Sequence, residues 1–75
     1  MFPVVRKYSR DDAAAVARAE AQRREWQWSE PEKVLPGFLS YAVFPAGYSR
    51  GRWAGPVVIV SSISGRVKSA GIARR

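Results

Sequence analysis

Residues 9–21 read SRDDAAAVARAEA, and this stretch decides the fold class because it holds the clearest helix signal in the chain. Ser9 is a favourable N-cap, and Asp12 stands three residues later, where an acidic side chain can complete a capping box. The alanine-rich run that follows has high intrinsic helix propensity. We expect the helix to run to about Trp28, because Pro31 disfavours helical backbone at Glu30.

Segments rich in β-branched and aromatic residues lie on both sides of the helix and predict strands. One is expected at residues 2–8, and three more at residues 38–44, 56–63 and 66–73. Residues 29–37 are interpreted as a Pro-bounded connection. The predicted fold class is α+β, a two-layer β-α-β-β-β arrangement with one helix packed on a small antiparallel sheet. Residues 1–75 should form a single domain, since so short a chain does not support two cores.

The register of the last hairpin has two solutions. A two-residue turn at Ser64-Gly65 would place Arg66 on the face of Ile63. One residue more in the turn pairs Val67 with Ile63 instead. We favour the second register because it buries more apolar surface.

The predicted helix carries two apolar stripes, of which one should cover the sheet. The other is either a set of exposed alanines, which we favour, or an interface with a partner or a second copy of the chain. Trp26 and Trp28 end the two stripes and are the candidates for a helix interface. The stripes comprise Ala14, Ala17, Ala21 and Trp28 on one side, and Ala15, Val16, Ala19 and Trp26 on the other.

The composition argues against most enzyme chemistry. The chain has no histidine and no cysteine, so it lacks the commonest general base, the thiol nucleophile and the usual zinc ligands. Of its six carboxylates, Asp11 and Asp12 are explained by helix capping, and Glu30 and Glu32 by an exposed turn at Glu30-Pro31-Glu32. We therefore predict a protein that is not an enzyme, with no catalytic residue, no metal site and no cofactor.

One local resemblance concerns residues 4–20, VVRKYSRDDAAAVARAE. They are similar to the opening strand and helix of N-acetyltransferases that use acetyl-CoA. That family binds the cofactor pyrophosphate with an Arg or Gln followed by a Gly-x-Gly pattern ahead of a helix, and this pattern has no counterpart here. The chain is also shorter than that fold requires, so no active residue is carried over.

Positive charge is the main functional signal, because thirteen Lys and Arg against six Asp and Glu give a formal net charge of +7. The loop at residues 45–55 places arginines and aromatic rings among recurring glycines. Arginine can pair with phosphate, a ring can stack on a base, and glycine permits close backbone approach. The alternative is structural, with Trp53 folding back on the core. The candidate binding residues are Tyr48, Arg50, Arg52, Trp53, Arg66, Lys68, Arg74 and Arg75.

The expected partner is therefore a nucleic acid, bound through the Gly/Arg/aromatic loop and the basic C-terminus. Two other functions remain open. The chain could be a small inhibitor or adaptor, of the type that mobile elements encode, docking on an acidic or nucleic-acid-handling protein. It could also be a structural subunit or a homodimer. We expect a cytoplasmic protein without membrane association, since no signal or spanning segment is evident.

Overall fold

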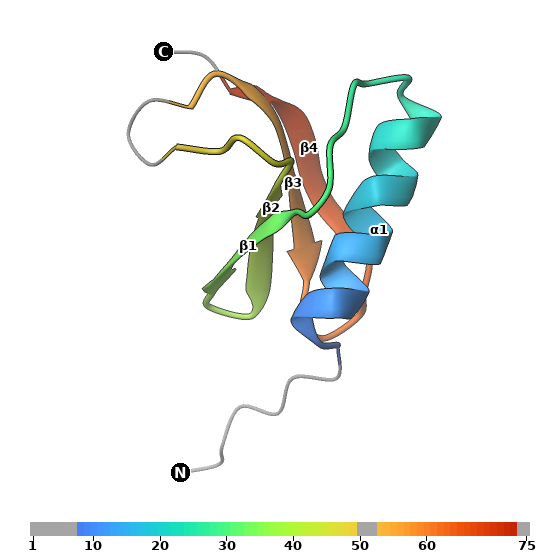
Figure 1. Cartoon of the computed structure of the whole chain (residues 1–75). Coiled ribbons are helices and arrows are strands. Elements are labelled where there is room, and N and C mark those ends of the chain that lie inside the picture. The colour runs from blue at the N-terminus through green and yellow to red at the C-terminus, as the bar shows by residue number, and fades with distance from the viewer. Residues whose placement is uncertain (1–7, 50–52, 74–75) are drawn as a thin grey trace, which may run out of the picture.

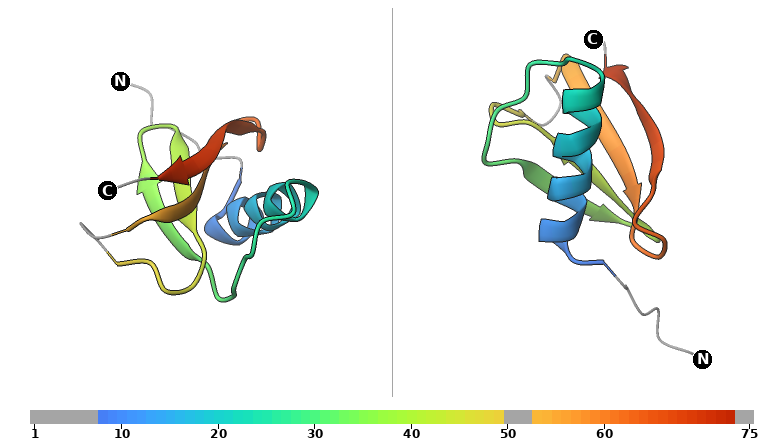
Figure 2. Two further views of the ribbon diagram at one scale, coloured as in Figure 1. Left: turned by 90° about the horizontal axis from the view of Figure 1, so that it is seen from above. Right: turned by 90° about the vertical axis from the view of Figure 1, so that its right-hand side faces the viewer.

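The computed structural model describes residues 8–49 and 53–73 (Figure 1). In these residues, α1 (Arg10–Arg23) is followed by four strands: β1 (Lys33–Gly37), β2 (Ser40–Phe44), β3 (Gly55–Ser61) and β4 (Val67–Ala73). The strands form one antiparallel sheet in the order β1-β2-β3-β4. The helix lies against one face of this sheet (Figure 2). The chain therefore has a small α+β fold, which is the class that the sequence predicts.

The segment before β2 corrects the prediction, because residues 29–37 are not only a connection. Lys33–Gly37 form β1, which pairs with β2. Pro36 hides this strand in the sequence, but β1 is an edge strand of the described sheet, where a residue without a backbone N–H is tolerated. The strand predicted at residues 2–8 lies outside the described residues, except for Tyr8, which occupies a bend.

The helix begins as predicted and ends early. The hydroxyl of Ser9 accepts a hydrogen bond from the Asp12 backbone N–H, and the Asp12 carboxylate accepts one from the Ser9 N–H. At the other end Glu25 has a φ of 59°, and the next N–H, that of Trp26, donates to the Ala21 carbonyl. The positive φ and this hydrogen bond define a Schellman motif, in which glycine usually occupies the position that Glu25 has here. The expected end at Trp28 is wrong because a glutamate occupies the position that normally signals the stop.

The core lies between α1 and the inner face of the sheet. Three alanines spaced four residues apart, Ala13, Ala17 and Ala21, are completely buried, and their small side chains let the helix approach the strands closely. Ala15 and Ala19 are exposed, as expected for solvent-facing alanines, but Val16 and Trp26 of the same predicted stripe pack against the core. The buried side chains of the sheet are Tyr41, Val43, Val58 and Val60.

The outer face of the sheet has no helix over it in the described part of the chain (Figure 2). Side chains alternate between the two faces of a strand, so the neighbours of the buried residues point outward. One cross-strand row on this face consists of Leu35, Ala42, Ile59 and Ser69. All but Ser69 are half-buried. The outer face is therefore a partly apolar surface.

The last hairpin has neither of the two predicted registers. Val67 pairs with Val60, and a bulge between Ile59 and Val60 shifts the pairing so that Ser69 lies opposite Ile59. The turn is longer than expected, since the Ser61 N–H donates to the Arg66 carbonyl. The bulge brings Val67 to the inner face, where it packs against the core. Burial of Val67 decides the register, as assumed, but its neighbour is Val60 rather than Ile63.

The helix stop generates a stability prediction. A residue with a side chain pays about 1–2 kcal/mol in the left-handed conformation, and glycine does not. Replacing Glu25, which is exposed, by glycine should therefore raise the free energy of unfolding by about 1 kcal/mol in urea denaturation. Glu25→Ala is the matched control, because it removes the carboxylate and keeps the Cβ. Equal stability of the two variants would contradict the assigned helix stop.

Candidate nucleic-acid interface

The pairing of the strands brings Lys33 and several aromatic residues to one end of the sheet. Lys33 at the start of β1 lies opposite Phe44 at the end of β2, and Gly55 at the start of β3 lies opposite Ala73 at the end of β4. The loop between β2 and β3 leaves from this same end (Figure 1). Its first residues are anchored, because the Ala46 N–H donates to the Ser29 carbonyl at 3.0 Å.

Three aromatic rings meet at this end. The rings of Phe44 and Tyr48 are stacked, with centroids 3.9 Å apart and an angle of 14° between their planes. Trp53 makes T-shaped contacts with both rings. Its ring centroid lies 6.1 Å from that of Phe44 and 5.8 Å from that of Tyr48. Its indole N–H donates to the Pro56 carbonyl at 3.2 Å. Trp53 thus folds back on the hairpin, but it packs on Phe44 and Tyr48 rather than on the core that the structural alternative named, and it precedes β3.

A hollow of about 550 Å³ lies beside this aromatic cluster, along β1. It is lined by Lys33, Leu35, Pro36 and Tyr48. Lys33 is exposed and forms no ion pair with any other described residue. The hollow therefore combines one aromatic ring, two apolar side chains and an ammonium group that is free to meet an anion.

The remaining candidate residues do not all converge on this end. Lys68 lies in β4, five residues before Ala73, which is a distance of about 17 Å along a strand. Arg66 lies further away, in the turn between β3 and β4. Arg50, Arg52, Arg74 and Arg75 lie outside the described residues; by sequence, the first two fall in the three-residue link between Ser49 and Trp53, and the last two follow Ala73.

Trp26 and Trp28 are not on the helix, which corrects their assignment to a helix interface. Both follow the end of α1 and are half-buried against the core. The Trp28 indole N–H donates to the carboxylate of Glu32 at 2.9 Å. These two side chains therefore close one edge of the core.

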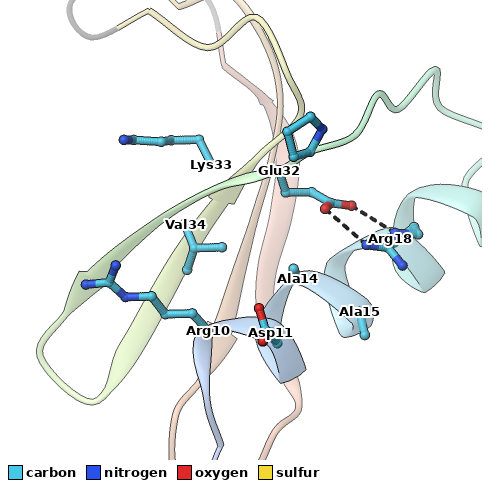
Figure 3. Close-up of a pocket in the computed structure, with 9 residues that line it drawn as sticks. Arg10, Asp11, Ala14, Ala15, Arg18, Glu32, Lys33 and Val34 are labelled. Atoms are coloured by element: carbon cyan, nitrogen blue, oxygen red, sulfur yellow. Dashed lines mark hydrogen bonds and ion pairs between the residues drawn. The ribbon is translucent and has the colours of Figure 1, made fainter.

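Glu32 accepts three side-chain hydrogen bonds from described residues, as many as Glu20 does. Arg18 donates to it from Nε at 2.9 Å and from an Nη at 3.1 Å, in a two-pronged pair beside the hollow between α1 and β1 (Figure 3). The Glu32 side chain is only 4% exposed, so the expected exposed turn is wrong at this residue. Burial raises the pKa of this carboxyl, but the hydrogen bonds from Arg18 and Trp28 outweigh burial and hold the pKa below its usual value.

The glutamates neutralise three arginines in the helix and at its C-terminal cap. Glu20 pairs with both Arg23 and Arg24, whose hydrogen bonds lower the pKa of its carboxyl. Arg18 pairs with Glu32 and also with Glu30. Among the described cations, those without an ion pair are Arg10, Lys33, Arg66 and Lys68. The unpaired positive charge of the described residues therefore lies at the start of the helix and in the sheet and its last turn, not at Arg18, Arg23 or Arg24.

Sequence reasoning missed Lys33 and Phe44 as parts of this end of the molecule. Lys33 falls in a segment whose prolines indicate a connection, and β-branched Val34 is the one local residue that favours a strand there. Phe44 was placed in a strand, but nothing local indicates that Tyr48 stacks on it. Both assignments depend on pairing between residues that are distant in sequence.

In comparisons with known proteins, no family model, curated protein or solved structure matches this chain. Within residues 8–49 and 53–73, α1 is too short and too polar to cross a membrane. The same residues contain no group of three acidic, histidine or cysteine side chains placed to hold a metal ion.

The Glu32 pair predicts a pH-dependent stability. Because the pKa of Glu32 is lowered on folding, its contribution is present above the pKa of the unfolded chain and is lost as the pH falls through the folded value. Glu32→Gln should lower the free energy of unfolding by about 1–3 kcal/mol at neutral pH, and by less in acid. The measurement is urea unfolding at several pH values.

Glu30→Gln is the matched control for this experiment, because Glu30 pairs with the same arginine while its side chain is 60% exposed. An exposed pair contributes about 0–1 kcal/mol. If the two variants lose the same stability with the same pH dependence, the central role of Glu32 is refuted.

Proposed function

We propose that this protein is a non-enzymatic basic module that binds nucleic acid at the end of the sheet where β2 and β3 are joined. The observation that carries the proposal is the distribution of ion pairs. Glu20, Glu30 and Glu32 are all engaged by arginines of α1, so the net positive charge of the chain is left for other surfaces. Phosphate is the abundant anion that such unpaired cations attract without regard to base sequence.

The aromatic end of the sheet suits this partner better than the other surfaces do. Lys33, Tyr48 and Trp53 are placed there by the strand pairing and by the ring contacts. In the sequence, Arg50 and Arg52 stand between Tyr48 and Trp53, and Arg74 and Arg75 follow the last residue of β4. A cation beside an aromatic ring is the combination by which single strands are held, through phosphate contact and base stacking.

The proposal predicts salt-sensitive binding. Affinity for a labelled single strand, measured by fluorescence anisotropy at about 50 and 200 mM salt, should fall steeply as counterions return to the phosphates. The double variant Arg50→Ala/Arg52→Ala should reduce the slope of log affinity against log salt by about 0.7 for each phosphate contact removed.

Arg23→Ala is the control for a change of charge alone. Arg23 is a helix arginine paired with Glu20, and Glu20 keeps its bond to Arg24 in the variant. Its salt slope should stay near that of the wild type. Binding that is independent of salt, or absent at low salt, would overturn the proposed function.

A second function, docking on an acidic protein, is favoured by the opposite end of the sheet. Phe38 is 82% exposed and Ile63 is 41% exposed. Their turns are joined by a hydrogen bond from the Ser62 N–H to the Leu39 carbonyl, at 3.1 Å. Leu39 has a φ of 59°, so a strained turn holds a large ring in water. Arg66, which has no ion pair among the described residues, ends the neighbouring turn.

This second function predicts that Phe38→Ala removes partner binding without loss of stability. Truncating an exposed ring should change the free energy of unfolding by no more than about 0.5 kcal/mol. Ile72→Ala is the control, because Ile72 is 50% exposed near the other end of the sheet. Quantitative affinity capture with the wild type and the two variants compares the two ends of the sheet. If Phe38→Ala and the wild type recover equal amounts of partner, the Phe38 turn is excluded as a docking surface.

A further inference from the structure

We infer that the hollow lined by Lys33, Leu35, Pro36 and Tyr48 is a binding site for one unpaired base of a single-stranded nucleic acid, with the adjoining phosphate on Lys33. The inference rests on the proposed function and deepens it, since it assigns the strand type and the contact for the base. It uses only described residues of β1 and of the first part of the β2–β3 loop.

The lining matches the two chemical parts of a nucleotide. A base offers a flat apolar face, and Tyr48, Leu35 and Pro36 provide a ring and two aliphatic surfaces for it. The phosphate is an anion, and Lys33 supplies an ammonium group without a protein partner among the described residues. Lys33 extends away from the Arg18–Glu32 pair, so these two helix-side charges do not compensate it (Figure 3).

The ring of Tyr48 is held in place before any ligand arrives. Phe44 covers one of its faces at 3.9 Å, and Trp53 contacts it edge-on. Trp53 is itself held by its hydrogen bond to Pro56 and by Gly55, where an added Cβ would lie 2.7 Å from the indole ring. A platform that is already ordered loses little entropy on binding, which favours a contact between ring and base.

The larger hollow, of about 570 Å³ between α1 and β1, is a poorer site for the same ligand. Its central arginine, Arg18, is engaged by two carboxylates. Asp11 offsets the charge of Arg10, which lines the hollow together with Lys33. No described aromatic ring lines it. A base paired in a duplex has its faces covered by neighbouring bases, so stacking on Tyr48 requires an unpaired nucleotide.

The test compares two probes of equal charge on the wild-type protein: labelled oligothymidine, and a strand of the same length made of abasic sugar-phosphate units. Stacking of one base contributes the equivalent of about 5- to 150-fold in affinity. We expect oligothymidine to bind more tightly by a factor in this range. Lys33→Ala should reduce the salt slope by about 0.7 with both probes.

Variants of Tyr48 test whether its ring causes the difference in affinity between oligothymidine and the abasic strand. Tyr48→Leu keeps an apolar side chain but removes the ring, so it should abolish the difference between the two probes. Tyr48→Phe keeps the ring and should retain the difference. Because the comparison of probes is made first on the wild-type protein, it remains informative even where Tyr48→Leu fails to fold.

Each outcome separates the inference from the proposed function. Salt-sensitive binding of both probes with equal affinity would leave the nucleic-acid module standing and overturn the base site. A base-dependent difference that persists in folded Tyr48→Leu would also overturn the site. Equal affinity for oligothymidine and for a duplex would refute the preference for an unpaired base, and absence of binding to any probe would refute both proposals.

Discussion

The arrangement of this small domain depends on the buried carboxylate of Glu32. It accepts two hydrogen bonds from Arg18 in the middle of α1 and one from the indole of Trp28, which follows the helix. A carboxylate that is 4% exposed requires such partners, because an unpaired buried charge would cost several kcal/mol. The next residue, Lys33, begins β1, so the residue that these bonds tie to α1 directly precedes the edge strand.

The ion pairs of Glu32 and of the other glutamates determine which described cations remain unpaired and can bind an anion. The acidic residues of the chain are few, and the glutamates around α1 neutralise three of its arginines. The helix side of the molecule is thereby close to internally balanced, whereas Lys33 on the other side of β1 has no such partner among the described residues. Among the described residues, the cations that can attract an anion without breaking an ion pair are therefore few and lie apart from the paired arginines.

The aromatic residues at the two ends of the sheet differ in their packing and exposure. At the end that includes Lys33, Tyr48 and Trp53 fold back onto Phe44 and become a rigid, half-buried platform. At the other end, the turn holds Phe38 in solvent. Core packing explains neither arrangement, because the core lies on the inner face between α1 and the valines of β2 and β3. These two ends are the surfaces on which the two proposed functions rest.

The sequence by itself determined what depends on near neighbours. The capping box at Ser9 and Asp12, the helical alanine run and the apolar strand around Val58 follow from propensity and short-range hydrogen bonds. Tertiary structure decided the rest. The helix stop at Glu25 uses a residue without a stop signal, and β1 exists because β2 supplies its hydrogen bonds at a sheet edge that tolerates Pro36. The candidate site belongs to this second group: Lys33, Phe44 and Tyr48 are brought together only by strand pairing and ring stacking, which no local pattern encodes.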